Sequence, residues 1–189
     1  SLEVIGTTAA DKENELEAVI RQTAKSLGVV GKVAACKGKG NATEQIAAAL
    51  EVIGKKAASK QLPVATWQVA LSLGVVGKKA AEQQLEDAIK KVALSLGVVG
   101  KKAAEQQLED AITQAALSIL SVGTTAVEKK VPEKTTERVA MWLAVLTTSE
   151  KKIVENAIQE YKSDKPGSAT VQKFLSQYNQ QLEKIKRHS

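Results

Sequence analysis

One histidine and one cysteine are the chain's candidates for nucleophilic or general-base chemistry near neutral pH. His188 lies next to last in a basic segment that we expect to fray. Lysines follow Cys36, and cationic neighbours favour a reactive thiol. However, the residues that follow it at intervals of 23 are Ser59, Glu82 and Glu105, which indicates an exposed surface position. Neither residue predicts a catalytic site, so we expect a protein that is not an enzyme.

Paired carboxylates occur as adjacent residues, Glu86-Asp87 and Glu109-Asp110. Adjacent side chains on a helix point apart, so these pairs are poorly arranged to share a proton or a metal ion. They suit the cap at the start of a helix better. Metal sites need clustered histidine, cysteine or carboxylate ligands, which the sequence lacks. We therefore predict no metal and no cofactor.

Four lysines each follow a glycine at a fixed interval and form the sharpest candidate for a binding site: Lys32, Lys55, Lys78 and Lys101. If each stood at the start of a helix, stacking would align them beside unpaired backbone N–H groups, an arrangement that attracts phosphate or carboxylate. The chain carries a net charge of +6, but aromatic residues make up only 3% of it. This composition disfavours specific nucleic-acid recognition and leaves two readings, a solvated charged face or a polyanion-binding stripe.

The lysines belong to a repeat of 23 residues, marked by Gly31, Gly54, Gly77, Gly100 and Gly123. Residues 69–89 recur letter for letter as residues 92–112. A fixed period of this size is typical of stacked repeats, in which each unit buries its apolar face against its neighbours. The first six residues, SLEVIG, nearly repeat residues 49–54, ALEVIG, so we expect the sequence to open inside a repeat, either cut from a longer array or processed there.

Apolar residues at intervals of three and four predict that each unit is helical. Leu85, Ile89, Val92, Leu96 and Val99 form one such stripe. Glycine is favoured just after a helix, so we expect each unit to consist of a short helix, then a longer helix, then a GVVG turn. The competing reading is a single bent helix of about 20 residues per unit, since the stripe is almost unbroken.

Helix starts within the units are indicated by residues that favour the first turn. Pro63 and Pro132 suit the start of a helix, because the missing N–H has no partner there in any case. Asn41 and Glu44 have the spacing of a capping box. The segment Asn41-Ala42-Thr43 also matches a glycosylation sequon, although helix capping explains the asparagine without it.

The segment ALSLGVVGKKAA, residues 93–104, followed by Leu108, resembles the ALxxLGxIGDxxAxxxL core of short HEAT-like repeats of the phycobilisome-lyase type. Lys101 stands where that pattern has aspartate. The resemblance spans about residues 15–123. It implies an α-solenoid that serves as a binding scaffold, and it carries no catalytic residues to this chain.

The last part of the chain differs in composition, because it holds Trp142, Tyr161, Phe174 and Tyr178. Ser168 is a suitable N-cap for a terminal amphipathic helix over residues 168–187, which we expect to seal the last repeat. We therefore predict an all-α fold, an α-solenoid of tandem 23-residue repeats with a C-terminal capping helix. The repeat array spans residues 1–146, with its last unit ending at Leu146, and the helical cap spans residues 147–189.

The valines of two GVVG segments provide the remaining surface hypothesis. Val75, Val76, Val98 and Val99 could line an apolar groove for a lipid or a partner helix, or could simply pack between units. The leading functional hypothesis is protein–protein binding or structural self-assembly. A lipid carrier comes second and a polyanion-binding module third. No apolar run is long enough to span a bilayer, so we expect a soluble chain, but the sequence does not indicate its compartment.

Overall fold

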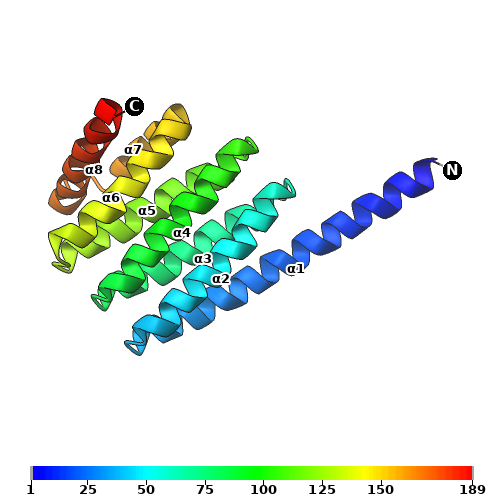
Figure 1. The fold of residues 1–189 in the computed structure, drawn as a ribbon, viewed down its shortest axis with the longest axis horizontal. Helices are drawn as coiled ribbons and strands as arrows, with labels where there is room; N and C mark the ends of the chain where they lie inside the picture. Colours follow the sequence, from blue (N-terminus) through cyan, green and yellow to red (C-terminus); the bar gives the residue numbers. More distant parts are fainter. Residues whose placement is uncertain (1, 189) are drawn as a thin grey trace.

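A computed structural model describes residues 2–188 of the chain, which form helices and the turns that join them, with no strand among them (Figure 1). Ser1 and Ser189, the outermost residues of the predicted domains, lie outside this range. The helices are α1 (Leu2–Cys36), α2 (Gly40–Ser59), α3 (Pro63–Glu82), α4 (Glu86–Glu105), α5 (Glu109–Glu128), α6 (Glu133–Ser149), α7 (Lys151–Ser163) and α8 (Ala169–His188). The all-α class predicted from the sequence is confirmed.

Each repeat is one helix and one turn. Helices α2 to α5 have 20 residues each, and their first residues follow one another at the 23-residue period. The single-helix reading is therefore confirmed, and the prediction of two helices per unit is wrong. The GVVG segments are not turns either, since Gly74–Gly77 lies inside α3. Tertiary packing outweighs the roughly 1 kcal/mol by which each glycine disfavours a helix.

The turns come three residues after the KKAA segments, and each contains one residue with positive φ. In α3 the helix ends with a Schellman motif, in which the N–H of Leu85 donates to the carbonyl of Ala80 at 3.0 Å. Gln84 lies between them with φ of 55°. The positive-φ residues are Gly38, Gln61, Gln84, Gln107 and Lys130, one per period. The sequence concealed these turns because most of them use glutamine or lysine where glycine is the usual residue.

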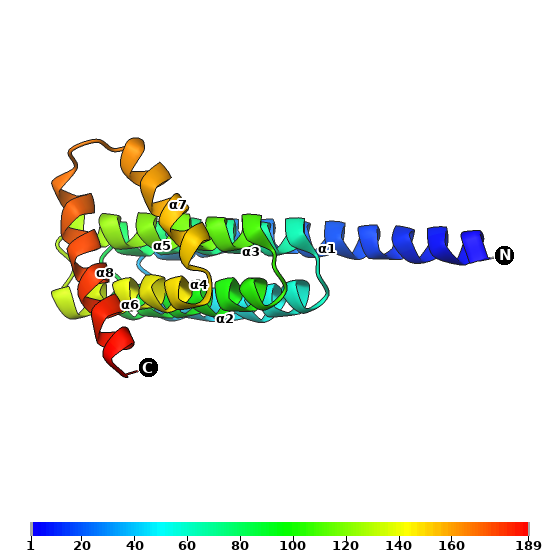
Figure 2. The same ribbon diagram turned by 90° about the horizontal axis from the view of Figure 1, so that it is seen from above.

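The helices stack in two layers, with α1, α3 and α5 in one and α2, α4 and α6 in the other (Figure 2). Successive helices are antiparallel and lie in opposite layers, so parallel neighbours in one layer are two units apart. The contacts of α3 with α5 and α1, and of α2 with α4, are the most extensive in the array. This arrangement is an α-solenoid of tandem 23-residue repeats.

The repeated glycines permit close approach of three helices. A Cβ atom on Gly54 would lie 2.7 Å from a methyl group of Val99 and 2.8 Å from one of Val69. Gly31 meets Val76 in the same way, at 2.6 Å. A glycine in one helix thus accommodates a branched side chain from each of the next two helices. Packing between units is the function of the glycine period.

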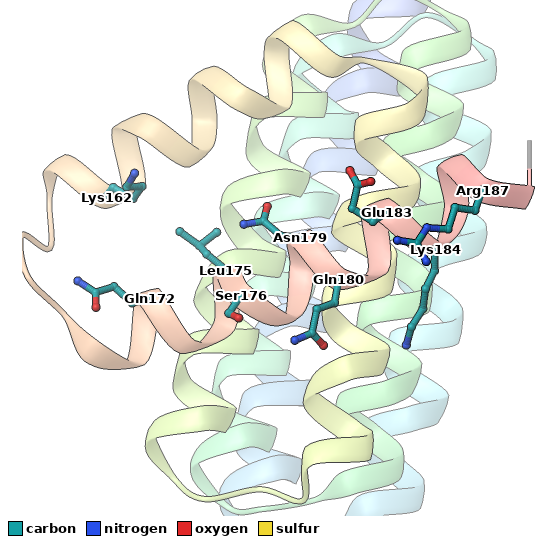
Figure 3. A pocket seen from close by; sticks show the side chains of 9 residues that line it. All are labelled: Lys162, Gln172, Leu175, Ser176, Asn179, Gln180, Glu183, Lys184 and Arg187. Atoms are coloured by element: carbon teal, nitrogen blue, oxygen red, sulfur yellow. The ribbon is translucent and has the colours of Figure 1, made fainter.

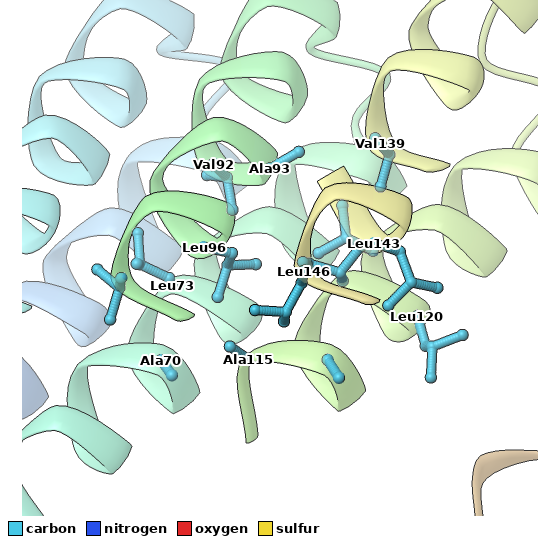
Figure 4. Close-up of a cluster of buried hydrophobic side chains, with 14 of the residues drawn as sticks. Ala70, Leu73, Val92, Ala93, Leu96, Ala115, Leu120, Val139, Leu143 and Leu146 are labelled. Atoms are coloured by element: carbon cyan, nitrogen blue, oxygen red, sulfur yellow. The ribbon is translucent and has the colours of Figure 1, made fainter. Parts of the chain in front are cut away.

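The core is continuous through the array and consists largely of alanine, valine and leucine. Figure 4 shows side chains of α3 to α6 in contact near the middle of the stack, among them Leu73, Leu96, Leu120 and Leu143. All four are fully buried. Each unit contributes only part of this core, so its stability depends on its neighbours.

Helices α7 and α8 cover the end of the array beyond α5 and α6 (Figures 1 and 2). The ring of Phe174 on α8 is fully buried and occupies the space over Gly123. Ser168 Oγ accepts the N–H of Val171 at 3.4 Å, so it caps α8 as expected. The prediction of a capping C-terminal helix is confirmed, while the domain boundary between residues 146 and 147 stays a prediction.

Helix α1 differs from the other array helices because it has 35 residues. Its C-terminal part stacks beside α3, and its N-terminal part extends past the ends of the other helices (Figures 1 and 2). The array therefore has one end covered by α7 and α8 and another end at α1 and α2.

Candidate functional site

The four lysines of the proposed anion site do not stand at helix N-termini. Lys32, Lys55, Lys78 and Lys101 are exposed and lie inside α1, α2, α3 and α4 respectively. Their backbone N–H groups therefore belong to helices and are not free to bind an anion. Because successive helices alternate between layers, the four lysines form two pairs, one in each layer. The expected single ladder is absent from the described structure, and anion binding stays a prediction.

The four valines of the proposed groove do not come together. Val76 and Val99 are fully buried, each over a glycine of the preceding parallel helix. Val75 is exposed on the outer side of its layer and Val98 is half-buried. The alternative reading, packing between units, describes Val76 and Val99. Binding of an apolar ligand elsewhere stays a prediction.

The histidine and the cysteine both lie at exposed helix ends. His188 is the last residue of α8, and its Nδ1 lies 2.7 Å from the carbonyl oxygen of Lys184. Cys36 is an exposed free thiol at the end of α1, as expected. Within residues 2–188 no group of three or more histidine, cysteine or carboxylate side chains could hold a metal ion.

The adjacent carboxylates lie in the first turns of helices and are not caps, because the N-cap positions of α4 and α5 are Leu85 and Leu108. Glu86 and Asp87 begin α4, and Glu109 and Asp110 begin α5. Glu86 accepts a hydrogen bond from the hydroxyl of Thr135 at 2.9 Å, which links the first turns of α4 and α6. These acids complement helix dipoles, and Glu86 also joins two parallel helices. Asn41 is not an N-cap, because α2 begins one residue earlier, at Gly40.

A broad depression of about 860 Å³ lies along α8 beside the end of α7 (Figure 3). Its lining is mostly amide and charged side chains: Lys162, Gln172, Leu175, Ser176, Asn179, Gln180, Glu183, Lys184 and Arg187. Glu183 accepts a hydrogen bond from Lys186, which holds the pKa of Glu183 below its usual range. The depression is an open polar surface and brings together no catalytic set.

The end of the array at α1 and α2 presents an apolar surface, which we call the open face. It consists of Val19, Thr23, Ser26 and Val30 on α1 with Ala49 and Ile53 on α2. Val19 is 63% exposed and Val30 is 55% exposed. Burying such a side chain contributes about 1.5–3 kcal/mol.

The same positions are buried one helix pair further along the chain. Val30 corresponds to Val76, which is 0% exposed because it packs over Gly31 of α1. Ile53 corresponds to Val99, which packs over Gly54 of α2. The open face thus has the surface that α3 and α4 use to contact the preceding pair. Sequence reasoning missed it, although comparison of Val30 with Val76 at twice the period would have indicated it.

Charged groups lie around the array and not on the open face itself. Glu51 of α2 accepts hydrogen bonds from two residues of α4, Lys91 at 2.7 Å and Ser95 at 2.9 Å. A hydrogen bond from Lys79 lowers the pKa of Glu82 on α3, and burial raises the pKa of Tyr178 on α8. The six residues of the open face are valine, threonine, serine, alanine and isoleucine, so the face offers apolar contact with no titratable side chain among them.

Comparisons with known proteins identify the fold alone. No protein-family model and no curated protein matches the chain. A solved structure titled "DHF46 filament" is similar, with a TM-score of 0.63 and 12% sequence identity over 88% of this chain and 94% of that one. No described helix has both the length and the hydrophobicity that crossing a membrane requires. The HEAT-like resemblance stays an expectation, and the shared feature is a stacked helical array.

Proposed function

We propose that this chain is a non-enzymatic scaffold that binds another protein surface, either a partner's or its own, through the open face. The observation that carries the proposal is the exposure of Val30 at a position where Val76 is fully buried. Burying this face would remove apolar side chains from water and reproduce a contact that the array already makes twice. A similar structure is titled a filament, which supports self-assembly as one form of this function.

A surface that matches an internal packing face favours a helical partner. In the array this face receives two helices that present glycine and alanine at the contact, as Gly31 and Gly54 do. A helix with small residues on one side would approach equally closely. The expected partner surface is therefore an apolar helix with small residues on its contacting side.

The test compares two neighbouring valines of α1. Val30 lies on the open face, whereas Val29 lies in the position of Val75, on the outer side of the layer, and is 58% exposed. Val30→Asp should abolish self-association in sedimentation and capture of partners from the native source, because it places a carboxylate in the contact. Val29→Asp introduces the same charge at a similarly exposed position, and it should retain both self-association and partner capture. Equal behaviour of the two variants in both assays would contradict the proposal.

A further inference from the structure

The N-terminal part of α1 carries the sequence of half a repeat. Residues 1–10, SLEVIGTTAA, differ from residues 49–58, ALEVIGKKAA, only at Ser1, Thr7 and Thr8. After two additional residues, Asp11 and Lys12, the segment ENELEAVI matches EQQLEDAI of residues 82–89 at its first, fourth, fifth and eighth positions. The chain thus contains the end of one helix, a turn-like segment and the start of the next.

In the later units the equivalent segment is a turn, but here it is helical. Gln84, with φ of 55°, reverses the chain between α3 and α4. Glu15 occupies the corresponding position, yet it lies within α1. Because α1 continues through this point, its N-terminal residues extend away from the array and do not fold back over α2 (Figure 1).

The extended segment and the open face are complementary. Residues 49–58 of α2 contact α3 and α4, where Gly54 meets Val69 and Val99. The matching segment, placed one helix pair earlier, has Gly6 in the position of Gly54. It would meet the two residues of the open face that correspond to Val69 and Val99, namely Thr23 and Ile53. One chain therefore holds both halves of a repeat contact and keeps them apart.

We propose that a second copy of the chain completes the contact, with residues 2–12 of each copy packed on the open face of the other. The inference rests on the proposed function and names its partner. It is an exchange of identical elements between two molecules. A straight helix replaces the turn in each copy, so the N-terminal segment of one copy contacts α1 and α2 of the other copy. The resulting contact is reciprocal and closes as a dimer.

The geometry of the repeat fixes how the two copies are related. In the array Gly31 faces Ile46 and Gly54 faces Val69 across antiparallel helices. Continuing this register into the exchanged contact makes the two α1 helices antiparallel. Residues 14 and 15 of both copies then lie at the two-fold axis.

Head-to-tail stacking is less favourable than this exchange. It would require the opposite end of the array to present the small-residue surface that the open face fits. That end is covered, since Phe174 of α8 fills the space over Gly123 and the hydroxyl of Tyr178 lies 3.2 Å from that of Thr147. A two-fold dimer needs no such surface.

The first experiment measures the mass of the full chain by light scattering and sedimentation over a range of concentrations. We expect a dimer for the unmodified chain and for Val29→Asp. For Thr23→Asp the dissociation constant should rise about 100-fold or more, because a carboxylate would be buried against the exchanged segment without a partner. A circular dichroism melt of each variant checks that the array is folded. A monomeric unmodified chain at all concentrations would overturn the inference.

The second experiment closes the hinge. Deletion of Asp11 and Lys12 together with Glu15→Gly restores the length of a normal unit and places glycine where the turn needs positive φ, as at Gly38. This variant should be a monomer, because its own segment can fold back onto the open face. The matched control, the same deletion with Glu15→Ala, favours the continuous helix and should dimerise more than the glycine variant. Equal dimerisation of the two would argue against exchange.

The third experiment tests the two-fold axis. With Cys36→Ser as background, Leu16→Cys, which lies on the same side of α1 as Thr23 and close to the axis, should form a covalent dimer on mild oxidation. Lys25→Cys on the same helix should form far less. If the chain associates but Leu16→Cys does not cross-link preferentially and the hinge variant has no effect, the exchange is wrong and the proposed function stands. If neither Thr23→Asp nor Val30→Asp changes association or partner capture, the proposed function fails as well.

Discussion

The two ends of the array complete their packing differently. At the C-terminal end, α7 and α8 cross the last helix pair, and the ring of Phe174 occupies the space over Gly123. At the N-terminal end, α1 and α2 expose the positions that every later pair buries, and Val30 is 55% exposed. The repeat array thus has a covered surface at its C-terminal end and an exposed one at its N-terminal end.

The difference shows that repeat sequence alone does not determine whether a surface is buried. Val30 and Val76 have equivalent neighbours in the sequence, and only the second has a helix pair on the side it faces. Stability in such arrays comes from interfaces between neighbours, so each terminal unit needs a cap or a partner.

The largest effect is expected at the covered end. Phe174→Ala should reduce the free energy of unfolding by about 3–5 kcal/mol, because it removes a fully buried ring and leaves a cavity over Gly123. The measurement is chemical denaturation followed by circular dichroism. A control is Gln180→Ala on the exposed side of the same helix, which should change stability by less than about 0.5 kcal/mol. A loss under about 1 kcal/mol for Phe174→Ala would mean that α8 does not seal the array.

A matched pair of valines compares the interior with the open end. Val76→Ala should cost about 2 kcal/mol, since two buried methyl groups are lost. Val30→Ala should cost less than about 0.5 kcal/mol in the monomer, because that side chain is largely solvated. Denaturation at several protein concentrations checks both values. If the loss of unfolding free energy caused by Val30→Ala grows with protein concentration, a second copy covers the open face in solution.

The fold class followed from the period, but the position of the turns did not. The GVVG segments suggested turns because glycine is a usual helix terminator, whereas here Gly54 permits contact with Val99 and Val69 from two other helices. The true turn contains Gln84 at positive φ, a position for which sequence reasoning expects glycine or asparagine. Sequence periodicity reports which residues recur, and only tertiary packing decides whether a glycine ends a helix or lies inside one.

The candidate sites were less predictable than the fold for the same reason. The lysines were correctly placed after each glycine, but the helices continue through that point, so Lys55 and Lys78 lie in different layers. The open face required knowing which side of α1 faces α3. That direction is set by contacts such as Gly31 with Val76, which span two units.

A moderate effect of opposite sign is expected from a buried amide in the cap. Gln177 is 4% exposed, and neither its amide nitrogen nor its amide oxygen has a hydrogen-bond partner within residues 2–188. Gln177→Leu should therefore stabilise the protein by about 1–2 kcal/mol. Gln180→Leu on the exposed side of α8 is the control, and thermal melts of both would measure the difference. Destabilisation by Gln177→Leu would show that the amide has a polar role in sealing this end.

The smallest effect is a pH dependence at the covered end. Burial raises the pKa of Tyr178, against a smaller opposing effect of its hydrogen bond with Thr147. The unfolded chain then loses the phenolic proton at a lower pH than the folded one, so the folded protein holds more protons above about pH 10. Stability should be unaffected by this group below about pH 9 and should fall as the pH rises further.

Melting temperatures of the unmodified chain and Tyr178→Phe, measured across this range, should differ by a constant amount below pH 9, and the advantage of the unmodified chain should shrink above about pH 10. A constant difference throughout would mean that the phenol is solvated and that α8 covers the array less closely than its contact with Thr147 indicates.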